Sequence, residues 1–201
     1  MCPKIVDRDK KRTDILRAAM KVFAARGIND FKMIDIAVAS GVGKGTLYEY
    51  FQSKDDVVIS CFHQFFEDYQ VHAEQGLTQP DDPADKIRQF IGLSFDFFRD
   101  QKERLDIVFD FYAAGLPRRG GRPLLDGMDD IYRELIGEVE AMIADGIKRK
   151  TFRTVDAHLA ASHLLALLDG LTFQAAMGVT DLSEKSLPDK ISQTFLNGIL
   201  R

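Results

Sequence analysis

The segment from Ile34 to Lys54 constrains the fold of this chain more than any other stretch, because it predicts two short helices joined by a tight turn. Apolar residues at its start follow a helical spacing, and Gly41 supplies the left-handed backbone that a turn after a helix needs. Val42 is the apolar residue of that turn, and a second helix is predicted from about Gly43 to Phe51. Two helices joined in this way are typical of a helix-turn-helix, whose second helix enters the DNA major groove.

The charge of the chain is divided unevenly, which supports this interpretation. The net charge over 201 residues is −4, yet residues 1–54 contain 11 Lys or Arg against 6 Asp or Glu, a balance of +5. The remaining residues carry −9. A basic module gains from the release of counterions at DNA phosphates, whereas an acidic body is held away from the duplex.

Hydrophobic periodicity predicts an all-α fold of about nine helices without strands or repeats. Ser53 is the expected cap of a long fourth helix, and Pro83 is expected in the first turn of the fifth. The predicted domains are a helix-turn-helix DNA-binding domain, 1–53, and a helical effector-binding and dimerisation domain, 54–201. The predicted helices are 9–26, 32–40, 43–51, 54–75, 83–101, 102–114, 124–150, 155–177 and 182–201, with Pro188 near the working start of the last.

The composition argues against several other classes of protein. No apolar run has the roughly 18 residues of a membrane span, and the N-terminus has no apolar stretch like that of a signal peptide, so we expect a cytoplasmic protein. Cys2 and Cys61 fit reduced thiols, and neither has metal-ligand spacing to another cysteine or histidine. We find no phosphate loop, metal cluster or nucleophile–base pattern. The sequence therefore predicts neither an enzyme nor a metal or cofactor site.

The run GVGKGTLYEYFQSK, residues 41–54, is the most characteristic part of a longer signature. With it, the chain resembles the tetracycline-repressor (TetR) family of bacterial regulators. The resemblance implies a homodimer that binds a palindromic operator, represses transcription and is released by a small molecule. The alternative is a DNA-binding activator or architectural protein without an effector. The matching residues are Phe23, Ala24, Gly27, Asp35, Ile36, Ala37, Gly41, Val42, Lys44, Gly45, Thr46, Leu47, Tyr48, Phe51, Ser53 and Lys54.

The resemblance also implies particular DNA contacts. Lys44 and Gly45 stand where members approach base edges, and the hydroxyl residues after them stand where members hold phosphates or thymine methyl groups. Lys54 stands where the long helix meets a phosphate, and Lys32 takes the place of a usual Ser or Thr and would attract phosphate by charge. Tyr50 could equally be part of the core. The residues predicted to contact DNA are Lys32, Lys44, Gly45, Thr46, Tyr48, Tyr50 and Lys54.

The body is rich in phenylalanine, which predicts an apolar cavity for a small apolar or amphipathic effector. Aromatic, lipid-like and cationic effectors all remain open. Polar groups on the same helices could orient the ligand: His63, Asp96, Asp106, Asp110 and Gln174. The residues predicted to line the cavity are Phe62, Phe66, Tyr69, Phe98, Phe109, Tyr112 and Phe173. A ligand held against Phe62, Phe66 or Tyr69 would tilt the long helix and change the spacing of the recognition helices.

The last two helices carry apolar stripes that predict a dimer interface. Two helical hairpins paired across a two-fold axis make a four-helix interface. The alternative is that both stripes face their own core, and the resemblance favours the interface. The residues predicted at it are Ala161, Leu164, Leu168, Leu171, Phe195, Leu196 and Ile199.

Overall fold

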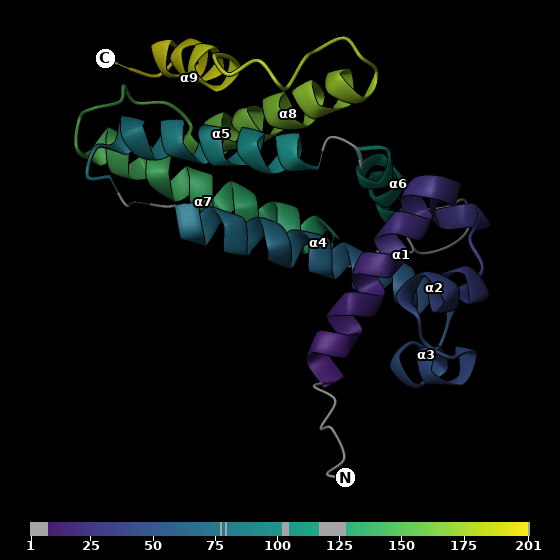
Figure 1. Ribbon diagram of the computed structural model, residues 1–201. Coiled ribbons are helices and arrows are strands. Elements are labelled where there is room, and N and C mark those ends of the chain that lie inside the picture. Colours follow the sequence, from purple (N-terminus) through teal and green to yellow (C-terminus); the bar gives the residue numbers. More distant parts are fainter. Residues whose placement is uncertain (1–7, 77, 79, 102–104, 117–127, 201) are drawn as a thin grey trace. The chain divides into compact units, whose positions relative to one another are not determined.

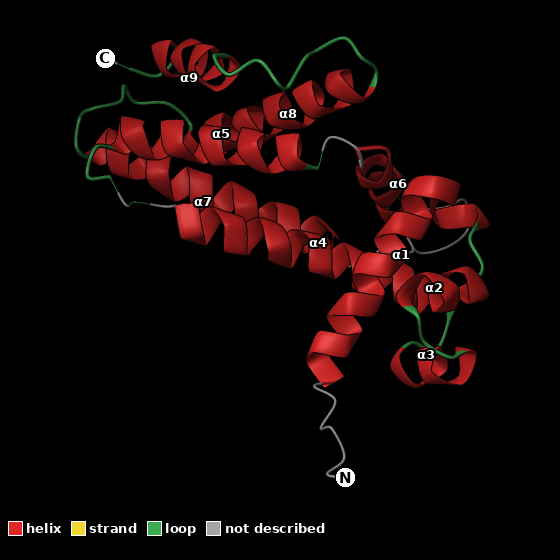
Figure 2. Cartoon of the chain, in the orientation of Figure 1, coloured by secondary structure: helices red, strands yellow, loops and turns green. Residues whose placement is uncertain are grey.

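A computed structural model describes residues 8–76, 78, 80–101, 105–116 and 128–200 (Figure 1). Within these ranges the fold is all-α, as predicted, and the one β-type pairing is an isolated bridge between Phe152 and Leu200 (Figure 2). The basic segment 117–123 and Cys2 lie outside the described residues. The helices are α1 Arg8–Asp30, α2 Met33–Ser40, α3 Lys44–Tyr50, α4 Lys54–Gly76, α5 Pro83–Asp100, α6 Leu105–Gly115, α7 Met128–Lys148, α8 Ala157–Ala176 and α9 Leu187–Asn197.

The chain divides into two compact units. The first unit contains the described residues of Met1–Asp68 and Asp106–Asp126, and the second contains those of Tyr69–Leu105 and Gly127–Arg201. The predicted domain boundary after residue 53 differs from this division, because part of α4 and all but the first residue of α6 belong with the first three helices. The division at 53 remains a prediction.

In the first unit, α1 contributes the apolar face that its sequence predicts, and Ile15, Ala19 and Phe23 are fully buried. The helix is broken near the predicted stop, since Gly27 has φ 75° and ψ 163°, a backbone that favours glycine. The next backbone amide, of Ile28, donates to Asp110 Oδ2 of α6 at 3.4 Å. The Asp110 carboxylate, which is distant in sequence, therefore accepts from a backbone amide that the break in the helix leaves available.

Aromatic side chains join α4 to α6 in the same unit. The Phe62 ring is buried and lies edge-on to Phe111, with ring centroids 5.7 Å apart. Arg12 of α1 reaches α4, where its Nη2 donates to Ser60 Oγ at 2.8 Å. Ser53 caps α4 as predicted, because its Oγ accepts from the Asp56 amide at 3.0 Å.

The second unit is built around α5 and α7, with α8 packed against α7 and α9 packed against α5 (Figure 1). The Asp82 carboxylate caps α5 by accepting from the Ala84 amide at 2.7 Å, and Pro83 lies in the first turn as predicted. Ile87 and Ile91 of α5 are completely buried. These contacts make α5 the central helix of this unit.

Two helix starts in this unit were predicted too early. The structure begins α8 at Ala157 rather than 155, because the Asp156 side chain accepts from the Leu159 amide at 2.9 Å and caps the helix there. It begins α9 at Leu187 rather than 182, with Pro188 in the first turn. Leu182 is buried, but it lies in a turn in which Asp181 Oδ1 accepts from the Ser183 amide at 2.9 Å. The buried Leu182 therefore lies before α9 and is not part of the helix.

The turn after α7 depends on a close approach at Gly146. A Cβ atom at this position would lie 2.1 Å from Phe152 Cδ2, and Phe152 is itself buried. The Gly146 carbonyl also accepts from the Phe152 amide at 3.0 Å. The absence of a side chain therefore allows the chain to fold back onto α7.

We expect Gly146→Ala to lower the free energy of unfolding by about 1–3 kcal/mol, because the new methyl group overpacks against the buried Phe152 ring. Gly137→Ala on the same helix is the matched control: its Cβ would meet nothing within 4 Å. The higher helix propensity of alanine at position 137 should stabilise the protein by about 0.5–1 kcal/mol. Urea denaturation measures both, and equal effects of the two substitutions would contradict the packing argument.

Candidate nucleic-acid interface and ligand cavity

The turn between α2 and α3 has the hydrogen bonds of a helix that ends in a left-handed glycine. Gly41 has φ 66°, and its amide donates to the Val38 carbonyl at 3.3 Å. The Val42 amide donates to the Ala37 carbonyl at 3.1 Å, and the Val42 side chain is half-buried. These two bonds satisfy carbonyls at the end of α2 and turn the chain toward α3.

The start of α2 is held by a carboxylate in place of the missing hydroxyl cap. Lys32 precedes the helix and its side chain makes no capping bond, but its backbone amide donates to Asp35 Oδ2 at 2.8 Å. The same oxygen accepts from Arg26 Nη1 of α1 at 3.1 Å. This role of Asp35 was not predicted, although an acidic residue at the third position of a helix is a known capping signal.

The residues predicted to contact DNA differ in exposure. Lys32 lies exposed before α2, and Lys44, Gly45 and Tyr48 are exposed on α3, whereas Leu47 of the same helix is buried. An added Cβ at Gly45 would meet nothing within 4 Å, so the backbone there is open to a close partner. Three further predicted residues are half-buried: Thr46, Tyr50 and Lys54.

Two of the half-buried residues have partners within the first unit. Lys54 Nζ donates to the Asn29 carbonyl at 2.6 Å and lies 4.5 Å from the centroid of the Phe31 ring. The Arg8 guanidinium lies 5.7 Å from the centroid of the Tyr50 ring. Lys54 therefore ties the start of α4 to the end of α1, and its contact with phosphate remains a prediction.

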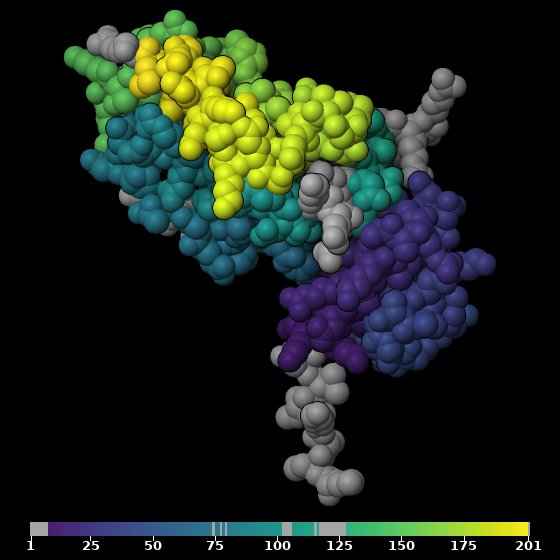
Figure 3. Space-filling view, turned by 45° about the horizontal axis from the view of Figure 1, so that its top comes forward, coloured from purple at the N-terminus to yellow at the C-terminus, as the bar shows by residue number. Residues whose placement is uncertain are grey.

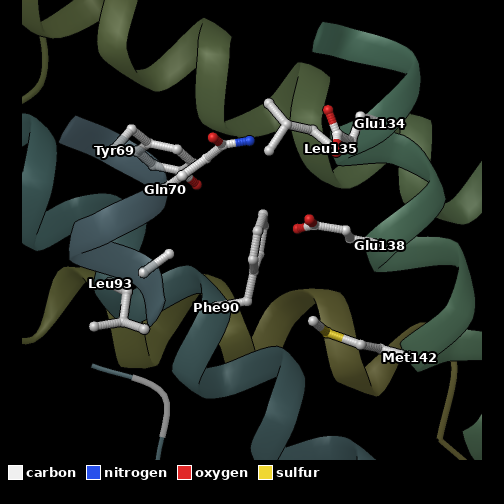
Figure 4. A pocket seen from close by; sticks show the side chains of 9 residues that line it. Tyr69, Gln70, Phe90, Leu93, Glu134, Leu135, Glu138 and Met142 are labelled. Carbon is white, nitrogen blue, oxygen red and sulfur yellow. The ribbon is translucent and has the colours of Figure 1, made fainter. Parts of the chain in front are cut away.

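A cavity of about 550 Å³ lies in the second unit, between the end of α4, α5 and α7 (Figure 4). Tyr69 and Phe90 are nearly buried in its wall, and the Tyr69 hydroxyl is hydrogen-bonded to Ser94 Oγ at 2.9 Å. Burial raises the pKa of Tyr69, the bond to Ser94 lowers it by less, and the negative charges of Glu138 and Asp169 raise it further. The lining residues are Tyr69, Gln70, Ala73, Phe90, Leu93, Glu134, Leu135, Glu138 and Met142.

The seven aromatic residues predicted to line one cavity do not gather at one place. Tyr69 alone among them lines the 550 Å³ cavity. Phe98 lines a much smaller void beside Thr172, and Phe173 has half of its surface exposed on α8. The other four lie in the first unit, in α4 and α6: Phe62, Phe66, Phe109 and Tyr112.

Comparison with known proteins gives family matches for both the N-terminal and the C-terminal part of the chain. Residues 15–61 match the model of the bacterial regulatory proteins of the tetR family. Residues 83–201, more than half of the chain, match the C-terminal model of BetI-type transcriptional repressors. The chain belongs to the TetR family. The resemblance and the prediction of a DNA-binding transcriptional regulator are thereby confirmed.

Individual relatives of this TetR-family protein are distant. The fatty acid metabolism regulator protein of Bacillus subtilis is 22% identical over 190 residues, which cover 94% of this chain and 95% of the relative. The transcriptional activator FasR of Mycolicibacterium smegmatis is 28% identical over 103 residues, 51% of this chain and 47% of FasR. The chain thus spans about half the length of FasR.

Solved structures confirm the fold of the TetR-family chain. The fatty acid degradation regulator FadR of Bacillus halodurans superposes with a TM-score of 0.78 at 21% identity, over 92% of this chain and 94% of FadR. GusR of Salmonella enterica superposes with a TM-score of 0.74 at 21% identity, over 96% and 97% of the two chains.

The residues predicted at the dimer interface of this TetR-family protein lie mostly in its own core. Leu171 and Phe195 are half-buried, while a different set of apolar side chains on α8 is exposed, including Leu159 and Leu167. A shallow groove runs between the start of α8 and α9, with Leu159 and Phe195 in its walls. The remaining predicted residues are buried within the protomer: Ala161, Leu164, Leu168, Leu196 and Ile199.

The length and apolar composition of α8 would also suit a membrane crossing, and a third of that stretch is buried. Core helices of soluble proteins meet the same two criteria. The α8 composition alone therefore does not assign this helix to a membrane.

Among the described residues no group of three or more His, Cys, Asp or Glu could hold a metal ion.

We expect Cys61 to resist alkylation in the folded TetR-family protein. Burial raises the pKa of its thiol to about 12, so at pH 8 the reactive thiolate is only about 0.01% of the population. In a Cys2→Ser background, iodoacetamide should label Cys61 slowly without denaturant and rapidly in urea. The doubly substituted variant, which also carries Cys61→Ser, is the blank. Labelling of the folded protein at the rate of a free thiol would contradict the buried position.

Proposed function

We propose that this protein binds a palindromic DNA operator as a homodimer in the bacterial cytoplasm and represses transcription until a small effector releases it. The observation that carries the proposal is the division of α3 into buried and exposed residues. Leu47 is completely buried, whereas Lys44, Gly45 and Tyr48 are exposed. A short helix fixed through its inner side can present its outer side to a major groove.

The outer side of α3 offers both kinds of contact that a DNA reader needs. Lys44 can donate to guanine base edges, and Gly45 permits a close approach because it has no side chain. Tyr48, Thr46 and Lys32 can donate to or attract phosphates, which fixes the orientation of the helix on the duplex. We therefore assign base contacts to Lys44 and positioning contacts to Lys32.

Repression, rather than activation, is favoured by the C-terminal match to BetI-type transcriptional repressors. FasR, which is described as an activator, matches only half of this chain. Transcription in vitro from a promoter that contains an operator selected from genomic DNA distinguishes repression from activation. Less transcript on addition of the protein supports repression, and more transcript supports activation.

The proposed effector site is the 550 Å³ cavity of the second unit, since its volume suits a small molecule. The proposed dimer interface uses the exposed apolar side chains of α8 together with the groove beside α9. Leu159 and Leu167 are eight residues apart, about 80° around the helix, which is within the width of one apolar stripe. Figure 3 shows this part of the second unit, coloured yellow-green to yellow, on the protein surface.

We expect Lys44→Ala and Lys32→Ala to weaken operator binding in different ways. Loss of a base contact at Lys44 should cost about 1–3 kcal/mol and relax the preference at one base pair. Loss of a phosphate contact at Lys32 should weaken all sequences alike and reduce the salt-dependence slope by about 1. Fluorescence anisotropy against an operator selected from genomic DNA measures both.

Lys148→Ala is the control, because Lys148 is exposed in the last turn of α7, in the second unit. It should leave operator affinity unchanged. If the affinities of Lys44→Ala for the operator and for shuffled DNA both equalled those of the wild type, α3 would not be the helix that reads the DNA sequence.

We expect Leu159→Glu combined with Leu167→Glu to convert a dimer into a monomer, because two carboxylates would have to be buried at the interface. Val71→Glu is the matched control: it also replaces an exposed apolar residue with glutamate, but on α4, outside the proposed interface. Sedimentation velocity at micromolar concentration measures the oligomeric state. A wild-type monomer would contradict the proposed dimer.

A further inference from the structure

The 550 Å³ cavity of the second unit carries negative charge on one wall. Glu134 and Glu138 lie four residues apart in α7, which places both on one side of the helix. Figure 4 shows the Glu138 carboxylate directed into the cavity toward the Phe90 ring. None of the described residues that line the cavity is basic.

Two neighbouring guanidinium groups are held by other carboxylates. Arg133, adjacent to Glu134 in sequence, is paired with Asp129 and Asp130. Arg88 of α5 is paired with Asp85 at 2.6 Å. These arginines lie on the helices that form the cavity, yet their ion pairs are with residues outside its lining.

The opposite wall is aromatic. Tyr69 has 9% and Phe90 has 7% of its surface exposed, so both rings are fixed and have lost most contact with water. The hydrogen bond between the Tyr69 hydroxyl and Ser94 Oγ further fixes the Tyr69 ring. A cation near an aromatic face is attracted by the ring quadrupole, and the attraction is strongest where water is excluded.

We propose that this cavity takes an organic cation with an alkyl or aromatic body. The cationic group lies near Glu134, Glu138 and the rings of Tyr69 and Phe90, and the apolar body packs on the aliphatic side chains that complete the lining. A carboxylate ligand of the same shape would meet two like charges, which is unfavourable. The inference rests on the proposed function for the role of the ligand as effector, but the site itself is tested separately.

The test is calorimetric titration of the full chain with three ligands that share a ten-carbon chain and differ in charge. These are decyltrimethylammonium, decanoate and 1-decanol, each kept below the concentration at which it forms aggregates. We expect decyltrimethylammonium to bind at least about tenfold more tightly than decanoate.

The double variant Glu134→Gln, Glu138→Gln should bind the cation about tenfold more weakly and decanoate more tightly. Both side chains are exposed at the cavity mouth, so the change should leave the fold intact, which thermal denaturation verifies. Glu140→Gln is the matched control, because it makes the same change in α7 at a residue that pairs with His158 rather than lining the cavity.

The outcomes separate this inference from the proposed function. Decanoate binding as tight as that of the cation, absence of cation binding, or a double variant with unchanged cation affinity each overturns the cation site. If decanoate or decanol then releases the operator, the proposed function stands without the cation. If the cation binds as expected but does not change operator affinity, the site stands and the effector role is wrong.

Discussion

The burial of Leu47 and Phe51 is the interaction on which the exposed residues of α3, the helix proposed to read DNA, depend. α3 has seven residues, and a helix of that length is not stable in water by itself. Both side chains are completely buried, and full burial of each contributes about 1.5–3 kcal/mol. The Arg12 guanidinium lies 5.4 Å from the Phe51 ring centroid and covers it from α1. The exposed residues of α3 are positioned because the inner ones are fixed.

The helix-turn-helix could be predicted from the sequence because its determinants are local. Gly41 ends α2, and Leu47 and Phe51 lie four residues apart, so a short segment contains both the turn and the core-facing side. The cavity could not be predicted in this way. Its walls come from α4, α5 and α7, which are distant in sequence, and a count of phenylalanines does not show which rings fill the core. The spacing of Glu134 and Glu138 was the available signal, since two acids on one side of a helix mark that side as polar.

The outcome for the residues predicted at a dimer interface has a similar explanation. The apolar pattern of α8 has two sides, and periodicity alone does not show which one faces the protomer. The structure turns Ala161, Leu164 and Leu168 inward and leaves Leu159 and Leu167 exposed. Small residues in the predicted stripe suit close packing of helices within one chain as well as between two chains. A helix that is apolar on both sides is what a bundle helix needs if it also meets a second copy.

The pairing of Phe62 with Phe111 has a consequence for how the chain is made. The first unit is interrupted in sequence by Tyr69–Leu105, so the ring that covers Phe62 is translated after this intervening segment of the second unit. At bacterial rates of synthesis the delay is about 3–10 s. During that time the helix-turn-helix can form from residues already synthesised, but α4 leaves the ribosome with an uncovered aromatic side. Completion of the first unit therefore waits for synthesis of part of the second unit, which puts the nascent chain within reach of chaperones before the first unit is complete.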